Sequence, residues 1–374
     1  MKKIIISGGG TGGHVFPAIA IANALRAKME DLEILFIGAK GRMEMEKVPA
    51  AGYHIEGLTV SGFQRRWTLK NLTFPFKLMA SMLKARSLIG HFKPDAVVGV
   101  GGYASGPTLR IATDKGIPTL IQEQNSFPGM TNRLLSKKVQ KICVAYSGME
   151  KYFPKNKIIL TGNPIRQDLI HLQGMEREAR KHFGLQEDVP VVLVMGGSGG
   201  AGTINQAMLE LVKELEKPND RSPIQILWQT GKYYYKSIQV QLKDTKKGIL
   251  VAVPFIDRMD LAYAAASLIV SRAGAIAISE LCVVAKPCIL IPSPNVAEDH
   301  QMKNARSLVD QQAALLVRDQ EAIEKLSSVI FQVMGNQELQ QSLAGHIKPL
   351  GIVNAADKIA DEIITLIKLS NPSS

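Results

Sequence analysis

A run of β-branched residues that ends in a glycine-rich loop constrains the fold of this chain more than any other feature. Residues 4–6 are isoleucine, and five of the six residues from Gly8 to Gly13 are glycine. The amphipathic segment 17–28 then predicts a helix. Strand, glycine loop and helix in this order bring backbone N–H groups onto a helix N-terminus, which favours binding of phosphate or another anion. A tight turn without a ligand is the alternative, because one glycine pattern is a weak signal.

The same design occurs a second time. The apolar segment 191–195 leads into the loop Gly196–Gly202, and a helical segment follows. Two such units predict two similar doubly wound α/β domains with loops that face a shared cleft. The length of 374 residues fits two domains. The turn 161–164 separates them, which gives domains at 1–164 and 165–350.

The segments after the second strand of each predicted domain argue against a dehydrogenase. Strand 32–37 continues as Gly-Ala-Lys-Gly-Arg, and strand 226–228 continues as Gln-Thr-Gly-Lys. A domain that binds NAD usually carries Asp or Glu there to hold the ribose. Further predicted strands at 96–100, 119–121, 249–253, 268–271 and 287–291 alternate with helices, so both sheets are expected to be mainly parallel.

Charge is distributed unevenly along the chain. Residues 1–164 contain 23 Lys and Arg against 10 Asp and Glu, whereas the remainder contains 22 against 23. The excess in the first half indicates an anionic partner: nucleic acid, anionic lipid or a phosphorylated substrate. No apolar run is long enough to span a bilayer, and no signal-peptide pattern is present, so a cytoplasmic protein is expected. Cys143, Cys282 and Cys288 lack metal-ligand spacing and are expected to be buried free thiols.

Residues 57–94 contain no Asp or Glu. Leu72, Phe76, Met79 and Leu83 fall on one face of a predicted helix. This face either packs on the core, with a solvated basic face opposite, or rests on anionic phospholipid. Nucleic acid is less favoured because no motif for it accompanies the patch. The segment also carries Arg65, Arg66, Lys70, Lys77, Lys84, Arg86 and Lys93 among the aromatic residues Phe63, Trp67 and Phe74 and the apolar residue Leu69.

The motifs that follow resemble one family closely. They are Ser7-Gly-Gly-Gly-Thr-Gly-Gly-His14, Gly101-Gly-Tyr-Ala-Ser-Gly-Pro107, Glu123-Gln-Asn125, Gly162-Asn-Pro-Ile-Arg166, the loop Gly196–Gly202, and Ser271-Arg-Ala-Gly-Ala275 with Glu280, Gln301 and Asn304. In this order, over nearly the whole chain, they resemble the MurG family of bacterial cell-wall glycosyltransferases. One departure is Gln122, where relatives often have His.

The resemblance implies a glycosyltransferase type B fold, with a last helix within 351–374 that packs back on the first domain. It implies transfer of N-acetylglucosamine from UDP-GlcNAc to the C4 hydroxyl of MurNAc in undecaprenyl-pyrophosphoryl-MurNAc-pentapeptide (lipid I), giving lipid II for peptidoglycan synthesis. It further implies a peripheral protein at the cytoplasmic face of the inner membrane, on anionic phospholipid, with other cell-wall proteins as potential partners. A UDP-GlcNAc 2-epimerase of the same fold, or a non-catalytic lipid- or nucleotide-binding protein, is the alternative.

The resemblance also assigns roles to individual residues. Ser198 and its loop would take the donor diphosphate, with Arg166 nearby, Glu280 the ribose, the backbone at Ile256 the uracil, and Gln301 with Asn304 the sugar. Thr11, Gly12, Gly13 and Asn125 would approach the donor from the first domain. Gly101, Gly102, Tyr103 and Ser105 would hold the acceptor pyrophosphate.

The chemistry needs a base for the acceptor hydroxyl and a stabiliser for the departing UDP. His14 is the first candidate base, with a purely phosphate-binding or loop-shaping role as its alternative; Glu123 is the second, unless it only orients an amide. No Asp-x-Asp sequence occurs, so we expect no metal and no cofactor.

Overall fold

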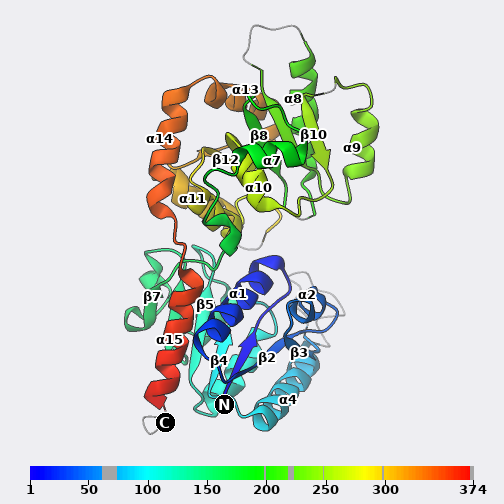
Figure 1. The fold of residues 1–374 in the computed structure, drawn as a ribbon. Coiled ribbons are helices and arrows are strands. Elements are labelled where there is room, and N and C mark those ends of the chain that lie inside the picture. The colour runs from blue at the N-terminus through cyan, green and yellow to red at the C-terminus, as the bar shows by residue number, and fades with distance from the viewer. Residues whose placement is uncertain (61–73, 198, 218–222, 247, 297–298, 371–374) are drawn as a thin grey trace. The chain divides into compact units, whose positions relative to one another are not determined.

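Two all-parallel β-sheets carry the fold in the computed structural model (Figure 1). The structure describes residues 1–60, 74–197, 199–217, 223–246, 248–296 and 299–370. Residues Met1–Ile165 together with Asn354–Ser374 form one compact unit, and Arg166–Val353 form the other.

The first unit contains a sheet with the strand order β3-β2-β1-β4-β5-β6-β7. Its strands are β1 (Lys2–Ser7), β2 (Leu32–Ala39), β3 (His54–Leu58), β4 (Ala96–Gly99), β5 (Thr119–Glu123), β6 (Lys141–Val144) and β7 (Ile158–Leu160). Its helices are α1 (Gly12–Lys28), α2 (Glu44–Ala50), α4 (Phe74–Phe92), α5 (Ser105–Asp114), α6 (Met130–Leu135) and α15 (Ala355–Ser370), with short 3-10 turns η1 (Met149–Lys151) and η2 (Lys155–Lys157).

The second unit contains a sheet with the strand order β10-β9-β8-β11-β12-β13. Its strands are β8 (Val191–Met195), β9 (Gln225–Gln229), β10 (Leu250–Val253), β11 (Leu268–Ser271), β12 (Cys288–Leu290) and β13 (Leu315–Leu316). Its helices are α7 (Glu176–Phe183), α8 (Gly202–Glu216), α9 (Tyr235–Gln241), α10 (Met259–Ala265), α11 (Ala275–Val284), α12 (His300–Val309), α13 (Ala322–Met334) and α14 (Gln337–Ile347), with 3-10 turns η3 (Gln167–Leu169), η5 (Asp319–Glu321) and η6 (Lys348–Leu350).

The isoleucine run of β1 is continuous because both faces of its sheet are covered. Ile4 and Ile6 belong to a core with α1 and α15, whereas Ile5 belongs to a second core that contains Ile89 of α4 and Leu109 of α5. All three isoleucines are fully buried, and each such side chain stabilises the fold by about 1.5–3 kcal/mol. A strand covered on both faces needs no polar alternation.

Helix α15 packs against α1 within the first unit, as Figure 1 shows for the C-terminal helix. Ile359 and Ile363 of α15 join the same core as Ile4. The Nζ atom of Lys28 lies 2.8 Å from a carboxylate oxygen of Asp361. The end of the chain therefore contributes to the core of the unit that contains its beginning.

The apolar residues predicted to share one face of α4 do not pack on the core in the described part of this helix. Phe76, Met79 and Leu83 are 77%, 62% and 62% exposed, whereas Ala85 and Ile89 face the core. The core-facing interpretation of that stripe is therefore wrong for these three residues, because the helix is rotated so that its small and C-terminal apolar residues meet the sheet. Leu72 and residues 61–71 lie outside the described residues.

Several boundaries differ from the predicted ones. Helix α1 begins at Gly12 rather than at residue 17, since the N-cap Thr11 is held in an extended conformation and the glycines that follow continue into the helix. Strand β3 was not predicted because its sequence, HIEGL, has weak strand propensity; pairing with β2 forms it.

The three cysteines are free and buried, as predicted. Burial raises the pKa of the Cys143 and Cys282 thiols to about 12 and raises that of Cys288 as well. Thiols of this kind stay protonated and unreactive near neutral pH.

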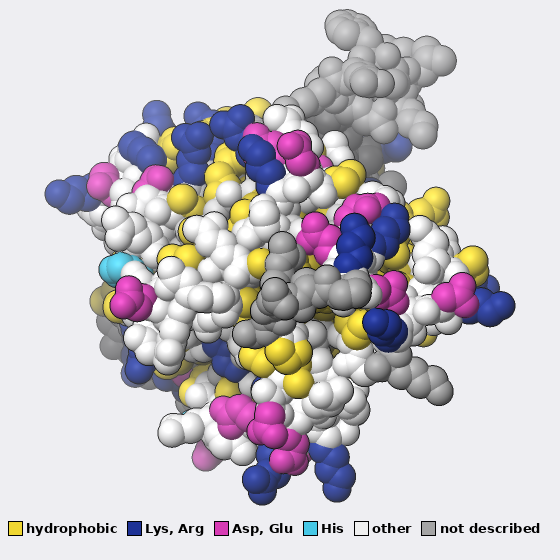
Figure 2. Space-filling model, turned by 90° about the horizontal axis from the view of Figure 1, so that it is seen from above, with side chains coloured by type: hydrophobic (Ala, Val, Ile, Leu, Met, Phe, Trp, Pro, Cys, Tyr) yellow, Lys and Arg dark blue, Asp and Glu magenta, His cyan; other side chains and the backbone are white. Residues whose placement is uncertain are grey.

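Surface charge is mixed on the face that Figure 2 presents, where acidic and basic side chains lie next to one another. Among the described residues, no helix combines the length and the apolar composition that crossing a membrane would require.

Candidate active site

The first glycine loop connects β1 to α1 and is braced by a carboxylate that sequence analysis missed. Glu44 of α2 is 1% exposed, and its two carboxylate oxygens accept hydrogen bonds from the backbone N–H groups of Gly10 (2.8 Å) and Ala39 (3.0 Å). Gly9 has φ 147°, and a Cβ there would lie 2.2 Å from the Glu44 carboxyl. Glu44 is thus an acidic residue five positions after the end of β2, near where an NAD-binding domain has its ribose-binding acid. In this protein its carboxylate binds the backbone of the glycine loop instead.

His14 lies in the first turn of α1 with a defined ring orientation. Its Nδ1 atom is 3.1 Å from the carbonyl oxygen of Gly9 and 3.3 Å from the Thr11 hydroxyl. A carbonyl only accepts hydrogen bonds, so the Gly9 contact assigns the proton to Nδ1 and the lone pair to Nε2. The arrangement suits a general base that acts through Nε2.

The second glycine-rich loop of the first unit interlocks with the first. The N–H of Gly9 donates to the carbonyl of Gly101 at 3.2 Å. A Cβ at Gly101 would lie 2.8 Å from Nε2 of His14, and one at Gly102 would lie 2.2 Å from the Gly9 carbonyl. Both positions have positive φ, so both need glycine. The structure thus brings His14, Thr11, Gly101 and Gly102 together.

Further along this loop, Tyr103 is 52% exposed and Ser105 is fully buried. The Ser105 hydroxyl makes no hydrogen bond within the described residues. A buried hydroxyl without a partner is costly and is a common feature of sites that bind a ligand.

Glu123 is engaged in organising the loop after β5. Its Oε1 accepts from the N–H (3.0 Å) and side-chain amide (3.2 Å) of Asn125, and its Oε2 accepts from the N–H of Gly129 (3.1 Å) and the side-chain amide of Asn132 (2.8 Å). It is 1% exposed. Its four hydrogen bonds fit the orienting role better than that of a base. Gln122 is also buried and donates to Asn163 at 2.9 Å.

The glycine loop of the second unit lies between β8 and α8, and Ser198 within it lies outside the described residues. Gly200 has φ 79°, and a Cβ there would lie 2.2 Å from the Thr230 carbonyl. Gln229, another residue that sequence analysis missed, donates to the Gly197 carbonyl (3.0 Å) and accepts from the N–H of Ile256 (2.9 Å). It joins the loop to the segment expected at the uracil.

Glu280 of α11 is buried and forms a polar cluster with the buried Tyr263 and with Arg166, whose side chain is 40% exposed. It accepts a hydrogen bond from the Tyr263 hydroxyl at 3.1 Å, and its Oε1 lies 3.5 Å from Nε of Arg166. Burial raises the pKa of the Glu280 carboxyl, against the opposing effects of Arg166 and Tyr263. A desolvated carboxylate of this kind gains from additional hydroxyl donors, and the two hydroxyls of a ribose supply them.

The remaining predicted residues lie on α12. The side-chain oxygen of Gln301 accepts from the N–H of Ser293 at 2.8 Å, and Asn304 donates to the Ala273 carbonyl at 3.4 Å. Both contacts connect α12 to loops at the carboxyl ends of β12 and β11. These are the sheet edges where open α/β domains bind ligands.

A side-chain network that sequence analysis missed supports the same edge. Arg272 donates to Asp319 at 2.5 Å and to the Ile291 carbonyl at 3.0 Å. Thr203, at the start of α8, donates to the other oxygen of Asp319 at 3.0 Å. Within the described residues, no group of three or more His, Cys, Asp or Glu side chains has the arrangement of a metal site.

Two parallel α/β sheets, each with a glycine loop ahead of a helix, have the architecture of glycosyltransferases that use nucleotide sugars. Family models agree: the glycosyltransferase family 28 N-terminal domain matches residues 4–144, and the family 28 C-terminal domain matches residues 191–361.

Similar proteins of known name identify the family within this class. The chain is 52% identical to a Cytophaga hutchinsonii protein, covering 98% of this chain and 97% of that protein, and 49% identical to one from Flavobacterium psychrophilum, covering 98% of each. Both bear the name UDP-N-acetylglucosamine--N-acetylmuramyl-(pentapeptide) pyrophosphoryl-undecaprenol N-acetylglucosamine transferase. The chain belongs to this family, the MurG glycosyltransferases, which confirms the family and fold expected from the motifs.

Solved structures support the same assignment. The crystal structure of Acinetobacter baumannii MurG matches with a TM-score of 0.78 at 28% identity, over 98% of this chain and 100% of that one. A UDP-GlcNAc 2-epimerase from Neisseria meningitidis matches with a TM-score of 0.65 at 17% identity, over 98% of this chain and 100% of that one. The second likeness shows a shared fold alone, so the transferase is favoured over the epimerase.

Proposed function

We propose that this glycosyltransferase moves N-acetylglucosamine from UDP-GlcNAc to the C4 hydroxyl of MurNAc in undecaprenyl-pyrophosphoryl-MurNAc-pentapeptide, giving lipid II. The main support for this proposal is that about half of the residues, over almost the full length, are identical to those of transferases with that name. The hydrogen-bonded His14 and the Glu280 cluster supply matching chemistry.

In the proposed reaction, the C4 oxygen attacks the anomeric carbon of the donor sugar from the face opposite the UDP. The bond between that carbon and the phosphate oxygen breaks, and its electron pair leaves with the diphosphate. The proton of the C4 hydroxyl passes to Nε2 of His14. A single displacement of this kind inverts the anomeric configuration.

Residues of the second unit make most of the proposed contacts to the donor. Glu280 accepts hydrogen bonds from the ribose hydroxyls, and Arg166 faces the phosphates. The Gly196–Gly202 loop, including Ser198, and the N-terminus of α8 stabilise the departing diphosphate. Ile256 contributes backbone contacts to the uracil, while Gln301 and Asn304 contact the sugar.

In the first unit, the loop at residues 101–107 faces the acceptor in this proposal. Thr11, Gly12, Gly13 and Asn125 approach the donor, and Gly101, Gly102, Tyr103 and Ser105 hold the acceptor pyrophosphate. Support for this comes from the buried Ser105 hydroxyl and from the contact of Gly101 with the His14 ring.

Incubation with labelled UDP-GlcNAc and a lipid I analogue tests this function. We expect label to appear in the lipid product and expect transfer to continue in EDTA, because backbone N–H groups and Arg166 take the place of a metal in this mechanism. Conversion of the donor without an acceptor would instead indicate an epimerase. Complete loss of transfer in EDTA, restored by Mg²⁺, would contradict the metal-free mechanism.

We further propose peripheral association with the cytoplasmic face of the inner membrane through α4. Phe76, Met79 and Leu83 are exposed on this helix, and Lys77 and Arg86 lie on it. Exposed apolar side chains among cations favour an anionic lipid surface. Other cell-wall synthesis proteins are proposed partners, and no nucleic acid is.

Replacing both Phe76 and Leu83 by glutamate is expected to lower binding to anionic vesicles at least about tenfold, because two apolar anchors are lost and two negative charges are added. Sedimentation with vesicles at increasing ionic strength measures this, and wild-type binding should weaken as salt rises. Val240→Glu, at an exposed apolar residue of α9, is the matched control. Wild-type binding that is absent or insensitive to salt would argue against the membrane proposal.

A further inference from the structure

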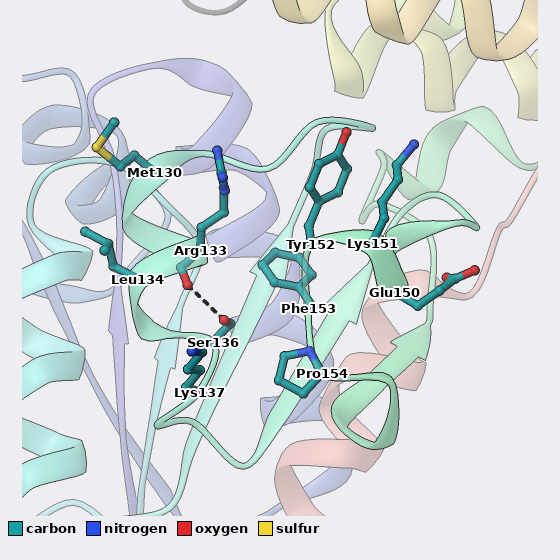
Figure 3. Close-up of a pocket in the computed structure, with 10 residues that line it drawn as sticks. All are labelled: Met130, Arg133, Leu134, Ser136, Lys137, Glu150, Lys151, Tyr152, Phe153 and Pro154. Carbon is teal, nitrogen blue, oxygen red and sulfur yellow. Dashed lines mark hydrogen bonds between the residues drawn. The ribbon is translucent and has the colours of Figure 1, made fainter.

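A pocket in the first unit contains none of the residues assigned above. It has a volume of about 520 Å³ and lies between α6 and the segment around η1, as Figure 3 shows. Pockets that bind small ligands usually measure roughly 300–1,000 Å³. We call it the α6 pocket and define it by Met130, Arg133, Leu134, Lys137, Lys151 and Tyr152.

The α6 pocket has an excess of positive charge. Arg133, Lys137 and Lys151 line it, against the single acid Glu150. Within the described residues, none of the three cations forms an ion pair; the Arg133 guanidinium lies 5.8 Å from the centre of the Phe127 ring, and Lys151 Nζ lies 5.1 Å from that of Tyr152. In Figure 3, Arg133, Tyr152 and Lys151 extend toward the same side, and Glu150 extends away from them.

Apolar surface accompanies these charges. Met130 and Leu134 are 62% and 74% exposed. An exposed apolar pair beside unpaired cations matches a ligand that carries both methyl groups and carboxylates.

Helix α6, which lines the α6 pocket, packs against α5, the helix that begins within the proposed acceptor loop. A Cβ at Gly106 would lie 3.3 Å from the side chain of Thr131, so the start of α5 lies against α6. Glu123 ties α6 to the loop after β5 through Asn132. The Asn132 side-chain oxygen, like the Ser105 hydroxyl, is buried and makes no hydrogen bond in the described part of the chain.

The distance from His14 to the α6 pocket is comparable to the length of an extended pentapeptide. Strands β1, β4, β5 and β6 are consecutive neighbours in the sheet, so the end of β1, near His14, and the end of β6, near η1, are three strand spacings or roughly 14 Å apart. An extended pentapeptide spans roughly 17 Å. In N-acetylmuramic acid, the peptide is attached through the lactyl group on C3, beside the C4 hydroxyl that reacts.

We propose that the α6 pocket binds the peptide of the acceptor, with Arg133 and Lys151 on its carboxylates and Met130 and Leu134 on its apolar groups. This inference rests on the proposed function. A peptide held there fixes the neighbouring C4 hydroxyl against His14, so the α6 pocket determines which acceptors are used efficiently.

The test compares two soluble short-chain acceptors, one with a free pentapeptide and one with every peptide carboxyl group amidated. The wild-type enzyme is expected to have a higher kcat/KM for the free carboxylates. In the double variant Arg133→Gln/Lys151→Gln, this preference is expected to fall about tenfold, because glutamine keeps a polar stem but lacks the charge. Lys115→Gln, an exposed cation beyond the end of α5, is the matched control.

The outcomes separate the alternatives. A preference that is unchanged in the double variant would overturn the inference. An equal loss for both acceptors, in a double variant whose thermal unfolding matches that of wild type, would overturn it as well. If the double variant unfolds at a lower temperature than wild type, Arg133→Gln alone repeats the comparison and decides it. Reduced vesicle binding with a wild-type carboxylate preference would assign the surface to lipid and refute the peptide site. Wild-type enzyme that transfers sugar to neither acceptor would refute the proposed function itself.

Discussion

Replacement of His14 by alanine is expected to lower kcat about 10²–10⁴-fold, the usual contribution of a general base. UDP affinity should change little, because the predicted UDP contacts of Glu280 and Ile256 belong to the second unit. Steady-state kinetics and UDP calorimetry measure both effects.

A second variant separates catalysis from loop structure. In His14→Asn, a side-chain amide can replace the Nδ1–H donor to the Gly9 carbonyl but supplies no base, so turnover should stay low while thermal stability stays near that of wild type. His54→Ala, at an exposed histidine of β3, is the control. Near-wild-type turnover in either His14 variant would remove this residue from the mechanism.

Replacement of Glu280 by glutamine is expected to weaken UDP binding about a hundredfold, because two charge-assisted hydrogen bonds to the ribose are lost. The protein should be as stable as wild type or more so. Burial raises the pKa of the Glu280 carboxyl, so its charged form is penalised in the folded state and stability is lost as pH rises through that pKa. Calorimetry with UDP and thermal unfolding at neutral pH measure the two effects.

The raised pKa of Glu280 also predicts how donor affinity depends on pH. The carboxyl loses its charge at a higher pH than an ordinary glutamate, so UDP affinity should weaken on acidification before other carboxylates titrate. Glu187→Gln, at an exposed glutamate, is the control. Unchanged UDP affinity with altered sugar selectivity would show that the ribose assignment is wrong.

The sequence predicts those helices and strands whose formation depends mainly on residues close together in the chain. The isoleucine run at residues 4–6 predicts a strand that the structure contains as β1, and the predicted strand 268–271 coincides with β11. The start of α1 was misplaced because Gly12 and Gly13 have low helix propensity, and only the fixed loop before them overrides it. The orientation of α4 was open, because periodicity identifies an apolar face without saying what covers it.

Residues that act through distant partners could not be found this way. Gln229 and Asp319 look like ordinary polar residues in the sequence, yet Gln229 joins the Gly197 loop to Ile256 and Asp319 joins Arg272 to Thr203. For Glu123, the sequence suggested a catalytic role that its contacts in the fold do not favour. Its chemistry allowed a base, and four hydrogen bonds visible only in the fold give it an orienting role.

The strand–loop–helix units, their duplication and the family can be identified from the sequence, because glycine loops and β-branched runs act locally and recur in fixed motifs. The contacts that hold the loops in place can be found only in the folded units. Glu44 meets Gly10 across 34 residues and Thr203 meets Asp319 across 116. Such contacts depend on which strands become neighbours in a sheet, and that is settled by packing of the whole unit rather than by any single segment.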